Sequence, residues 1–302
     1  MAMRDLPRAE TAWNDMRLSK VIELDKEGEE DLHKAMNGEL ELGDIQELIP
    51  QMFEIIRNRG LDVAPLRAWV REVVDVKKVK KSDVELFVST VSLTDRKGLE
   101  IKINDLPEDE ICDMLLASAY HPSFRLEKLG GKLYTDGGFV DSLPLHALVV
   151  NGYKDIIAVR IPGMGWERRF RMPDDVNVTT IHTNSDLGFV LNFDAEQSRR
   201  DMAIGYLDAQ RVLYGLYGQK YYIDRTMTDH EALEWLLDHC AEEGENLRTV
   251  CEKELPRLAR KLNAEDGDYY ELMAAKLEQE CANRDIDNMR IYTDKELIAL
   301  AG

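Results

Sequence analysis

The residues best suited to chemistry in this sequence are one acid followed by two glycines, Asp136, Gly137 and Gly138. The preceding residues, KLYT, are typical of a strand, which would carry Asp136 to its carboxyl end. The glycines allow the backbone to turn sharply there. Because α/β enzymes place working groups just outside the carboxyl ends of parallel strands, Asp136 is a candidate functional carboxylate. An Asp-Gly pair is also common in ordinary tight turns, and the dipeptide alone favours that simpler interpretation.

Common patterns for nucleotide or metal binding are absent from the sequence, which has no GxGxxG, GxxxxGK(S/T), HExxH or EF-hand loop. Its four cysteines are widely spaced and form no CxxC pair, which argues against a zinc ribbon or a disulfide scaffold and fits reduced thiols. Among the histidines, His230 and His239 alone approach metal-ligand spacing, and both lie among acids on a predicted helix, where we expect a solvated face. We therefore expect no metal and no cofactor.

The charge balance limits the choice of partners. The chain has 302 residues, with 39 Lys and Arg against 58 Asp and Glu, so its formal net charge is −19. Nucleic acid is excluded as a main partner because phosphate binding needs a basic face. No apolar run approaches the roughly 20 residues of a transmembrane helix, and the charged start is not a signal peptide. We expect a soluble cytoplasmic protein.

The elements that must position Asp136 can be predicted from periodicity. Apolar residues recur at helical spacing over residues 44–60 and again over 63–74. Residues 84–93 and 99–103 are rich in β-branched types and flank the polar turn TDRKG, which predicts a hairpin or two neighbouring strands. A helix over about 107–119 then precedes the strand that carries Asp136.

The rest of the chain predicts an α/β part followed by helices. The strand before Asp136, a short helix over 144–152 and an apolar strand over 155–161 form the βαβ pattern of a parallel sheet. Residues 176–182 predict a further strand, and nearly everything after Asp194 predicts helix. We expect an α/β domain over residues 1–225 and an acidic helical extension over 226–302.

Three ordered motifs around Asp136 resemble the patatin-like phospholipases, a family of serine acyl hydrolases. That family has an Ala-Ser-x-x-x-Pro element, then Tyr-x-Asp-Gly-Gly, then an acidic or Asn-containing turn with Leu-Pro. The corresponding residues here are 117–122, 134–138 and 141–144. The resemblance extends back through residues 66–95 and forward through 185–223, and it starts near residue 9. It implies a three-layer α/β/α sandwich, with a C-terminal helical extension in this chain, and a lipid or acyl-ester substrate.

The resemblance also implies a role for each residue of the turn. The family's catalytic pair is a serine on a GxSxG elbow and the aspartate of the Asp-Gly-Gly motif, which accepts the serine proton without a histidine. Asp136 corresponds to that aspartate, and Gly137 and Gly138 to the motif turn. A glycine-rich loop supplies the oxyanion hole in the family. Neither that loop nor GxSxG occurs in this sequence, so the resemblance implies an incomplete sheet that lacks the family's N-terminal strands.

No other serine is expected to replace the nucleophile. Ser118 falls at a helix end, and Ser89 and Ser92 lie in a strand without the flanking glycines of an elbow. His146 lies ten residues after Asp136, but on a predicted helix, where a packed or surface histidine is expected rather than a triad member.

Three interpretations remain open from the sequence. The chain is part of a patatin-like acyl hydrolase that needs a complementary N-terminal segment, a non-catalytic patatin-like binding or regulatory module, or an unrelated α/β protein with a coincidental Asp-Gly-Gly turn. Under the first, the chain alone is inactive. Because the strands over 84–93 and 155–161 read as buried, missing neighbours would leave an open sheet edge, and we expect self-association or binding of the missing segment.

Overall fold

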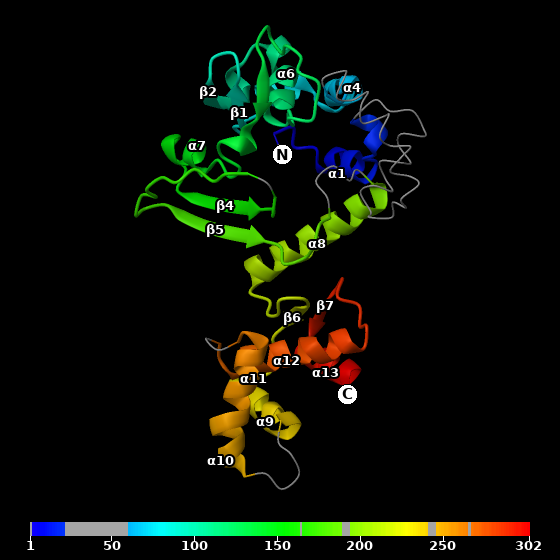
Figure 1. Cartoon of the computed structure of the whole chain (residues 1–302), viewed down its shortest axis with the longest axis vertical. Coiled ribbons are helices and arrows are strands. Elements are labelled where there is room, and N and C mark those ends of the chain that lie inside the picture. Colours follow the sequence, from blue (N-terminus) through cyan, green and yellow to red (C-terminus); the bar gives the residue numbers. More distant parts are fainter. Residues whose placement is uncertain (1, 22–59, 164, 189–193, 241–245, 265–266) are drawn as a thin grey trace. The chain divides into compact units, whose positions relative to one another are not determined.

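The structure is a computed structural model that describes residues 2–21, 60–163, 165–188, 194–240, 246–264 and 267–302 (Figure 1). The predicted helix over 44–60 lies outside these residues. The chain divides into two compact units. Unit 1 comprises residues 1–180 and 187–201, and unit 2 comprises residues 181–186 and 202–302. The domain boundary expected near residue 225 stays a prediction.

Unit 1 holds the hairpin and the Asp136 strand. Its helices are α1 (Leu6–Asn14), α4 (Ala64–Val73), α5 (Val76–Lys81), α6 (Glu108–Ser118) and α7 (Leu145–Val150), and its strands β1 (Phe87–Ser92), β2 (Lys97–Lys102), β3 (Tyr134–Asp136) and β4 (Asp155–Arg160). Strand β1 is central in a sheet of order β2-β1-β3, antiparallel to both neighbours. The TDRKG turn closes the predicted hairpin, with Phe87 opposite Lys102 and Ser92 opposite Lys97.

Helix α6 forms the centre of the unit 1 core. Three acids occupy its first turn, where the helix dipole favours negative charge. Its apolar side chains Ile111, Met114 and Leu116 are buried, and the helix packs on β1 and β3. The C-terminus of α6 thereby lies beside the strand that carries Asp136.

The predicted α/β class is confirmed, but the strands form small separate sheets instead of the expected βαβ arrangement. Strand β4 pairs with β5 (Asn177–His182), and the two arrows point the same way in Figure 1. Strand β3 pairs with β1. The amide of Asp136 donates to the carbonyl of Tyr120 at 2.9 Å, so this part of the Asp136 strand is already hydrogen-bonded to another segment.

Strand β4 also differs from the expected strand with two buried faces. It buries Ile156 and Ala158, whereas the side chains of Ile157 and Val159 are about 60% exposed. The alternation is that of a strand with one covered face.

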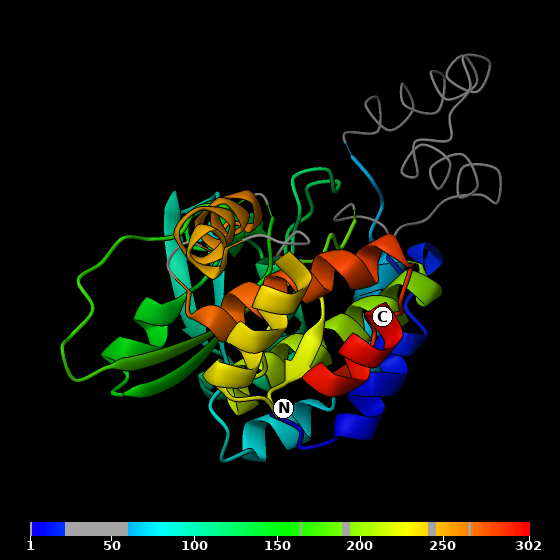
Figure 2. The same ribbon diagram turned by 90° about the horizontal axis from the view of Figure 1, so that it is seen from below.

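Unit 2 is a small helical assembly, as the C-terminal sequence predicted, with two short strands added. After α8 (Ala195–Tyr214), which the unit boundary divides, it contains β6 (Tyr222–Asp224), α9 (Asp229–Cys240), α10 (Leu247–Thr249), a π-helical turn (Val250–Glu254), α11 (Leu255–Leu262), α12 (Tyr269–Asn283), β7 (Ile291–Thr293) and α13 (Asp294–Ala301). Strands β6 and β7 are parallel. Helix α12 packs against α9, α11 and α13 (Figure 2).

Buried carboxylates fix the turns of unit 2. Asp294, the first residue of α13, is buried and accepts hydrogen bonds from the amides of Thr226 and Met227 at 2.7 and 2.9 Å, and from the Tyr270 hydroxyl at 2.9 Å. Burial alone would raise the pKa of Asp294, but these donors outweigh it and hold the pKa below its ordinary value.

Candidate functional site

The backbone of Asp136 is held from both sides. Asp136 lies opposite Thr90 in the β1–β3 ladder, and its amide bonds to Tyr120 just after α6. The Thr90 hydroxyl, which is buried, lies 2.9 Å from the Ala117 carbonyl and 3.0 Å from that of Thr135. The last turn of α6, β1 and β3 are therefore joined directly beside Asp136, which fixes the position of its Cα.

The Asp136 side chain presents one engaged and one open oxygen. Its Oδ1 accepts the Gly138 amide at 2.7 Å, in the manner of a helix N-cap. This is the one hydrogen bond that the carboxylate makes within the described residues. The residue is partly buried. The second oxygen, Oδ2, is thus free to accept a proton from a hydroxyl brought against it.

The two glycines of the motif are required by close approach. A Cβ on Gly137 would lie 2.3 Å from both the carbonyl oxygen and Oγ of Ser89, closer than real Cβ contacts. A Cβ on Gly138 would lie 3.1 Å from Asp136 Oδ1. Sequence reasoning assigned these glycines to a sharp turn; the structure shows that Gly137 also lets the turn rest against β1.

The serines considered from the sequence do not engage Asp136. Ser89 Oγ donates weakly to the Asp141 carbonyl at 3.4 Å, and Ser92 Oγ donates to Asp95 Oδ2 at 3.0 Å. Ser118 ends α6. None of the described serines makes a hydrogen bond to the Asp136 carboxylate.

His146 belongs to a different cluster. Its Nδ1 lies 3.0 Å from Glu100 Oε2 and 3.4 Å from the guanidinium of Arg168, and its ring meets that of Phe170 edge-on. The histidine is therefore engaged at the surface of β2 and not with Asp136.

A cavity of about 590 Å³ lies against the motif turn. It is lined by β1, by β2 and by Gly137, Val140, Asp141 and Arg168. Asp141 is buried, and its Oδ1 lies 3.3 Å from the amides of Leu143 and Arg168. Asp141 therefore holds the segment around Arg168 onto the motif turn, a role that its sequence position did not reveal.

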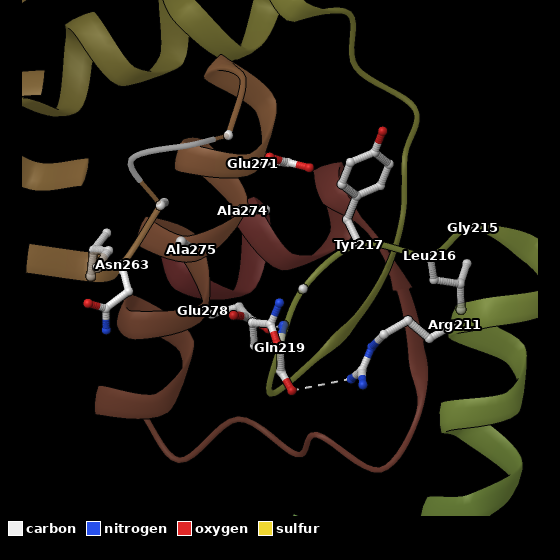
Figure 3. A pocket seen from close by; sticks show the side chains of 14 residues that line it. Arg211, Gly215, Leu216, Tyr217, Gln219, Asn263, Glu271, Ala274, Ala275 and Glu278 are labelled. Atoms are coloured by element: carbon white, nitrogen blue, oxygen red, sulfur yellow. Dashed lines mark hydrogen bonds between the residues drawn. The ribbon is translucent and has the colours of Figure 1, made fainter. Parts of the chain in front are cut away.

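A second cavity, of about 610 Å³, lies within unit 2 between the end of α8, the turn before β6 and α12 (Figure 3). Glu278 of α12 accepts the amides of Gln219, Lys220 and Tyr221 on one oxygen at 2.7–2.8 Å. Burial raises the pKa of Glu278, and these three donors only partly oppose it. Arg211 reaches toward the Gln219 carbonyl at the same wall.

Within the described part of the chain, no three His, Cys, Asp or Glu side chains gather closely enough to hold a metal ion. No described helix combines the length and the apolar character needed to cross a bilayer.

The fold and the site define an α/β protein with an aspartate held at a strand end by an Asp-Gly-Gly turn. The family model of the patatin-like phospholipases matches residues 8–149, which include the motif turn, so this region of the chain is patatin-like, as the three motifs predicted. The family is one of lipid hydrolases. The resemblance expected over residues 185–223 lies outside the match and stays a prediction. No curated protein matches the chain.

Proposed function

We propose that the patatin-like region is the aspartate-bearing part of a lipid acyl hydrolase, in which Asp136 is the base of a Ser-Asp dyad. The observation that supports this most directly is the Asp136 carboxylate itself. One oxygen is fixed by the Gly138 amide, and the other has no partner among the described residues. A base needs this combination of fixed position and an open acceptor. The nucleophile comes from a segment outside these 302 residues, because the sequence has no GxSxG elbow.

The proposed reaction proceeds in two steps. The serine Oγ attacks the ester carbonyl while its proton passes to Asp136, and the C–O bond to the alcohol breaks as the alcohol takes the proton from Asp136. Water then attacks the acyl-serine, gives its proton to Asp136, and releases the acid as the proton returns to the serine. The oxyanion donors come from the same complementary segment as the serine.

The alternative is a patatin-like binding or regulatory module without catalysis. It is favoured by one observation: none of the described serines makes a hydrogen bond to the Asp136 carboxylate, so these serines offer no nucleophile there. Both proposals predict that the 302-residue chain alone is inactive. They differ in whether a segment that carries the nucleophile is encoded with it.

The deciding experiment starts from the coding DNA directly upstream of codon 1. Under the proposal, the frame continues upstream into a glycine-rich loop and GxSxG, or a neighbouring gene encodes them. The complete frame, or the two chains expressed together, then hydrolyses phospholipid vesicles and short-chain esters. Asp136→Asn lowers kcat by about 10²–10⁴-fold, because the amide keeps the Gly138 hydrogen bond and cannot take the serine proton.

The matched control is Asp175→Asn, which makes the same change in charge at a surface ion pair with Lys154. It should retain full activity. Activity of Asp136→Asn within tenfold of the parent would remove Asp136 from the role of base. Absence of any encoded nucleophile segment would favour the binding module.

A further inference from the structure

The segment after β4 carries an unusual concentration of exposed aromatic and basic side chains. Residues 165–171 read Gly-Trp-Glu-Arg-Arg-Phe-Arg and are named the arginine loop here. Trp166 is 73% exposed, the largest exposed fraction among the described large apolar side chains. Large apolar side chains that stay exposed together mark interaction surfaces.

The arginine loop is fastened to the motif turn that follows Asp136. The Trp166 amide donates to the Gly138 carbonyl at 3.0 Å, and the Ser142 amide donates to the Trp166 carbonyl at 2.7 Å. Gly165 packs so closely that a Cβ would lie 2.9 Å from Ser142 Cβ. The Arg168 amide bonds to buried Asp141. The backbone of the loop is thus a fixed neighbour of the motif turn.

The motif turn adds two more apolar side chains to this surface. Phe139 and Val140, which directly follow Gly138, are 44% and 46% exposed. The Trp166 backbone is hydrogen-bonded to Gly138, just before Phe139, and to Ser142, two residues after Val140. The segment that carries Trp166 therefore lies next to the segment that carries Phe139 and Val140. A tryptophan and a phenylalanine with their apolar bodies exposed are suited to the region between lipid headgroups and acyl chains.

The charge of the arginine loop opposes that of the chain. It has three arginines and one glutamate, while the whole chain has a net charge of −19. Arg168 pairs with Glu100, and Glu167 pairs with Arg160 just outside the loop. Arg169 and Arg171 are exposed and form no ion pair with the described residues. Two cations without an ion-pair partner among the described residues therefore follow the exposed tryptophan in the same loop.

We propose that the arginine loop, together with Phe139 and Val140, is the surface by which unit 1 adsorbs to an anionic lipid bilayer. Arg169 and Arg171 attract anionic headgroups within about a Debye length, about 8 Å at physiological ionic strength, while Trp166 and Phe139 enter the interface. The net charge of the chain repels the same membrane, so the local cations decide the orientation of approach. The choice of a lipid partner rests on the proposed function; the surface itself rests on exposure and charge.

This attachment has a consequence for the candidate site. Because the loop is hydrogen-bonded to Gly138 and Ser142, a bilayer that binds Trp166 lies against the motif turn. Asp136 is two residues from Gly138 and bonded to its amide. Adsorption in this orientation delivers lipid esters to the side of the molecule that holds the proposed base.

The test is a vesicle flotation assay with the 302-residue chain, which needs no hydrolysis. Vesicles contain phosphatidylcholine alone or with 30 mol% phosphatidylglycerol. Wild type should float with the anionic vesicles and lose binding at high salt. Arg169→Gln/Arg171→Gln should bind about 25-fold more weakly, since each arginine near an anionic surface contributes about fivefold. Trp166→Ala should lose about tenfold through lost apolar contact.

Matched controls are Trp13→Ala, another exposed tryptophan in unit 1, and Arg248→Gln/Arg257→Gln, two exposed arginines in unit 2. Both should bind as wild type does. No wild-type binding, equal binding to the two vesicle types, or loop variants within twofold of wild type would each overturn the proposal. Self-association that Trp166→Ala abolishes would assign the surface to a second copy and overturn it too. Vesicle binding with no activity of the completed enzyme would leave this surface standing and refute the proposed function alone.

Discussion

We expect Gly137→Ala to push the motif turn and β3 away from β1. The substitution would thereby destabilise unit 1 and displace Asp136. The added Cβ would lie 2.3 Å from the Ser89 carbonyl oxygen, whereas ordinary contacts begin at 3.4 Å. The nearest atoms include β1 backbone, so no side-chain rotation can relieve the clash. The turn must therefore move away from β1 by about 1 Å.

The size of the effect follows from what that movement breaks. A shift of about 1 Å stretches the 3.0 Å hydrogen bond from Thr90 to the Thr135 carbonyl beyond bonding distance. Loss of a hydrogen bond costs about 1 kcal/mol, and overpacking of a close contact about 1–3 kcal/mol. We expect the free energy of unfolding of unit 1 to fall by about 3 kcal/mol in total. For a unit of this size that corresponds to about 6–12 °C in Tm.

The measurement is urea unfolding followed by tryptophan fluorescence in a Trp235→Phe background, because the remaining tryptophans, Trp13, Trp69 and Trp166, all belong to unit 1. Gly163→Ala is the control: nothing lies within 4 Å of its Cβ position, and its change should stay within 0.5 kcal/mol. A Gly137→Ala loss as small as that of the control would refute the argument that close approach explains the motif glycine.

Three further expectations concern the chain as it stands. A fluorophosphonate probe should leave the 302-residue chain unlabelled, because no described serine meets Asp136; labelling at the rate of an active hydrolase would contradict this. Burial raises the pKa of Glu278, so the stability of unit 2 should fall as the pH rises through that pKa. The Tm gain of Glu278→Gln over wild type should therefore grow from pH 4 to pH 8, and a constant difference in Tm would contradict this. The exposed side chains of Ile157 and Val159 lead us to expect self-association and binding of a hydrophobic dye, measured by light scattering and fluorescence; a monomer that binds little dye would be the contrary result.

Local features of the fold could be predicted because their causes are local. The hairpin follows from two β-branched segments around TDRKG, and its register is the one that this turn closes. Helix α6 begins directly after Pro107 with three acids, a pattern readable in the sequence. The helix over 144–152 ends before Gly152, whose φ of +87° suits glycine.

Hydrogen-bonded pairing between segments that are distant in the sequence could not be predicted from the sequence. The expectation that β3 and β4 share a sheet used the spacing of a βαβ unit, but the backbone of Tyr120 bonds to the Asp136 amide and β4 pairs with β5 instead. Periodicity shows which residues form a strand, not which neighbour supplies the hydrogen bonds. Glu278 was overlooked for the same reason, because its three amide donors lie about 58 residues away.

The Asp-Gly-Gly turn combines features that the local sequence predicts with a contact to a distant segment that it does not predict. Motif order alone predicts that Asp136 is the candidate base and that two glycines follow it, whereas the close approach of Gly137 to Ser89 is seen only in the structure. What the motif does not contain is the contact between residues 136–142 and residues 165–168, since no spacing rule joins them. That contact converts an Asp-Gly-Gly turn into a two-segment surface: one segment holds a carboxylate oxygen open for a proton, and the other presents a tryptophan and two uncompensated arginines. A base that acts on lipid esters must meet them at an interface. The two backbone hydrogen bonds that join Trp166 to the motif turn, one donated to the Gly138 carbonyl and one accepted from the Ser142 amide, would place the proposed base and the proposed membrane-binding surface on one side of unit 1.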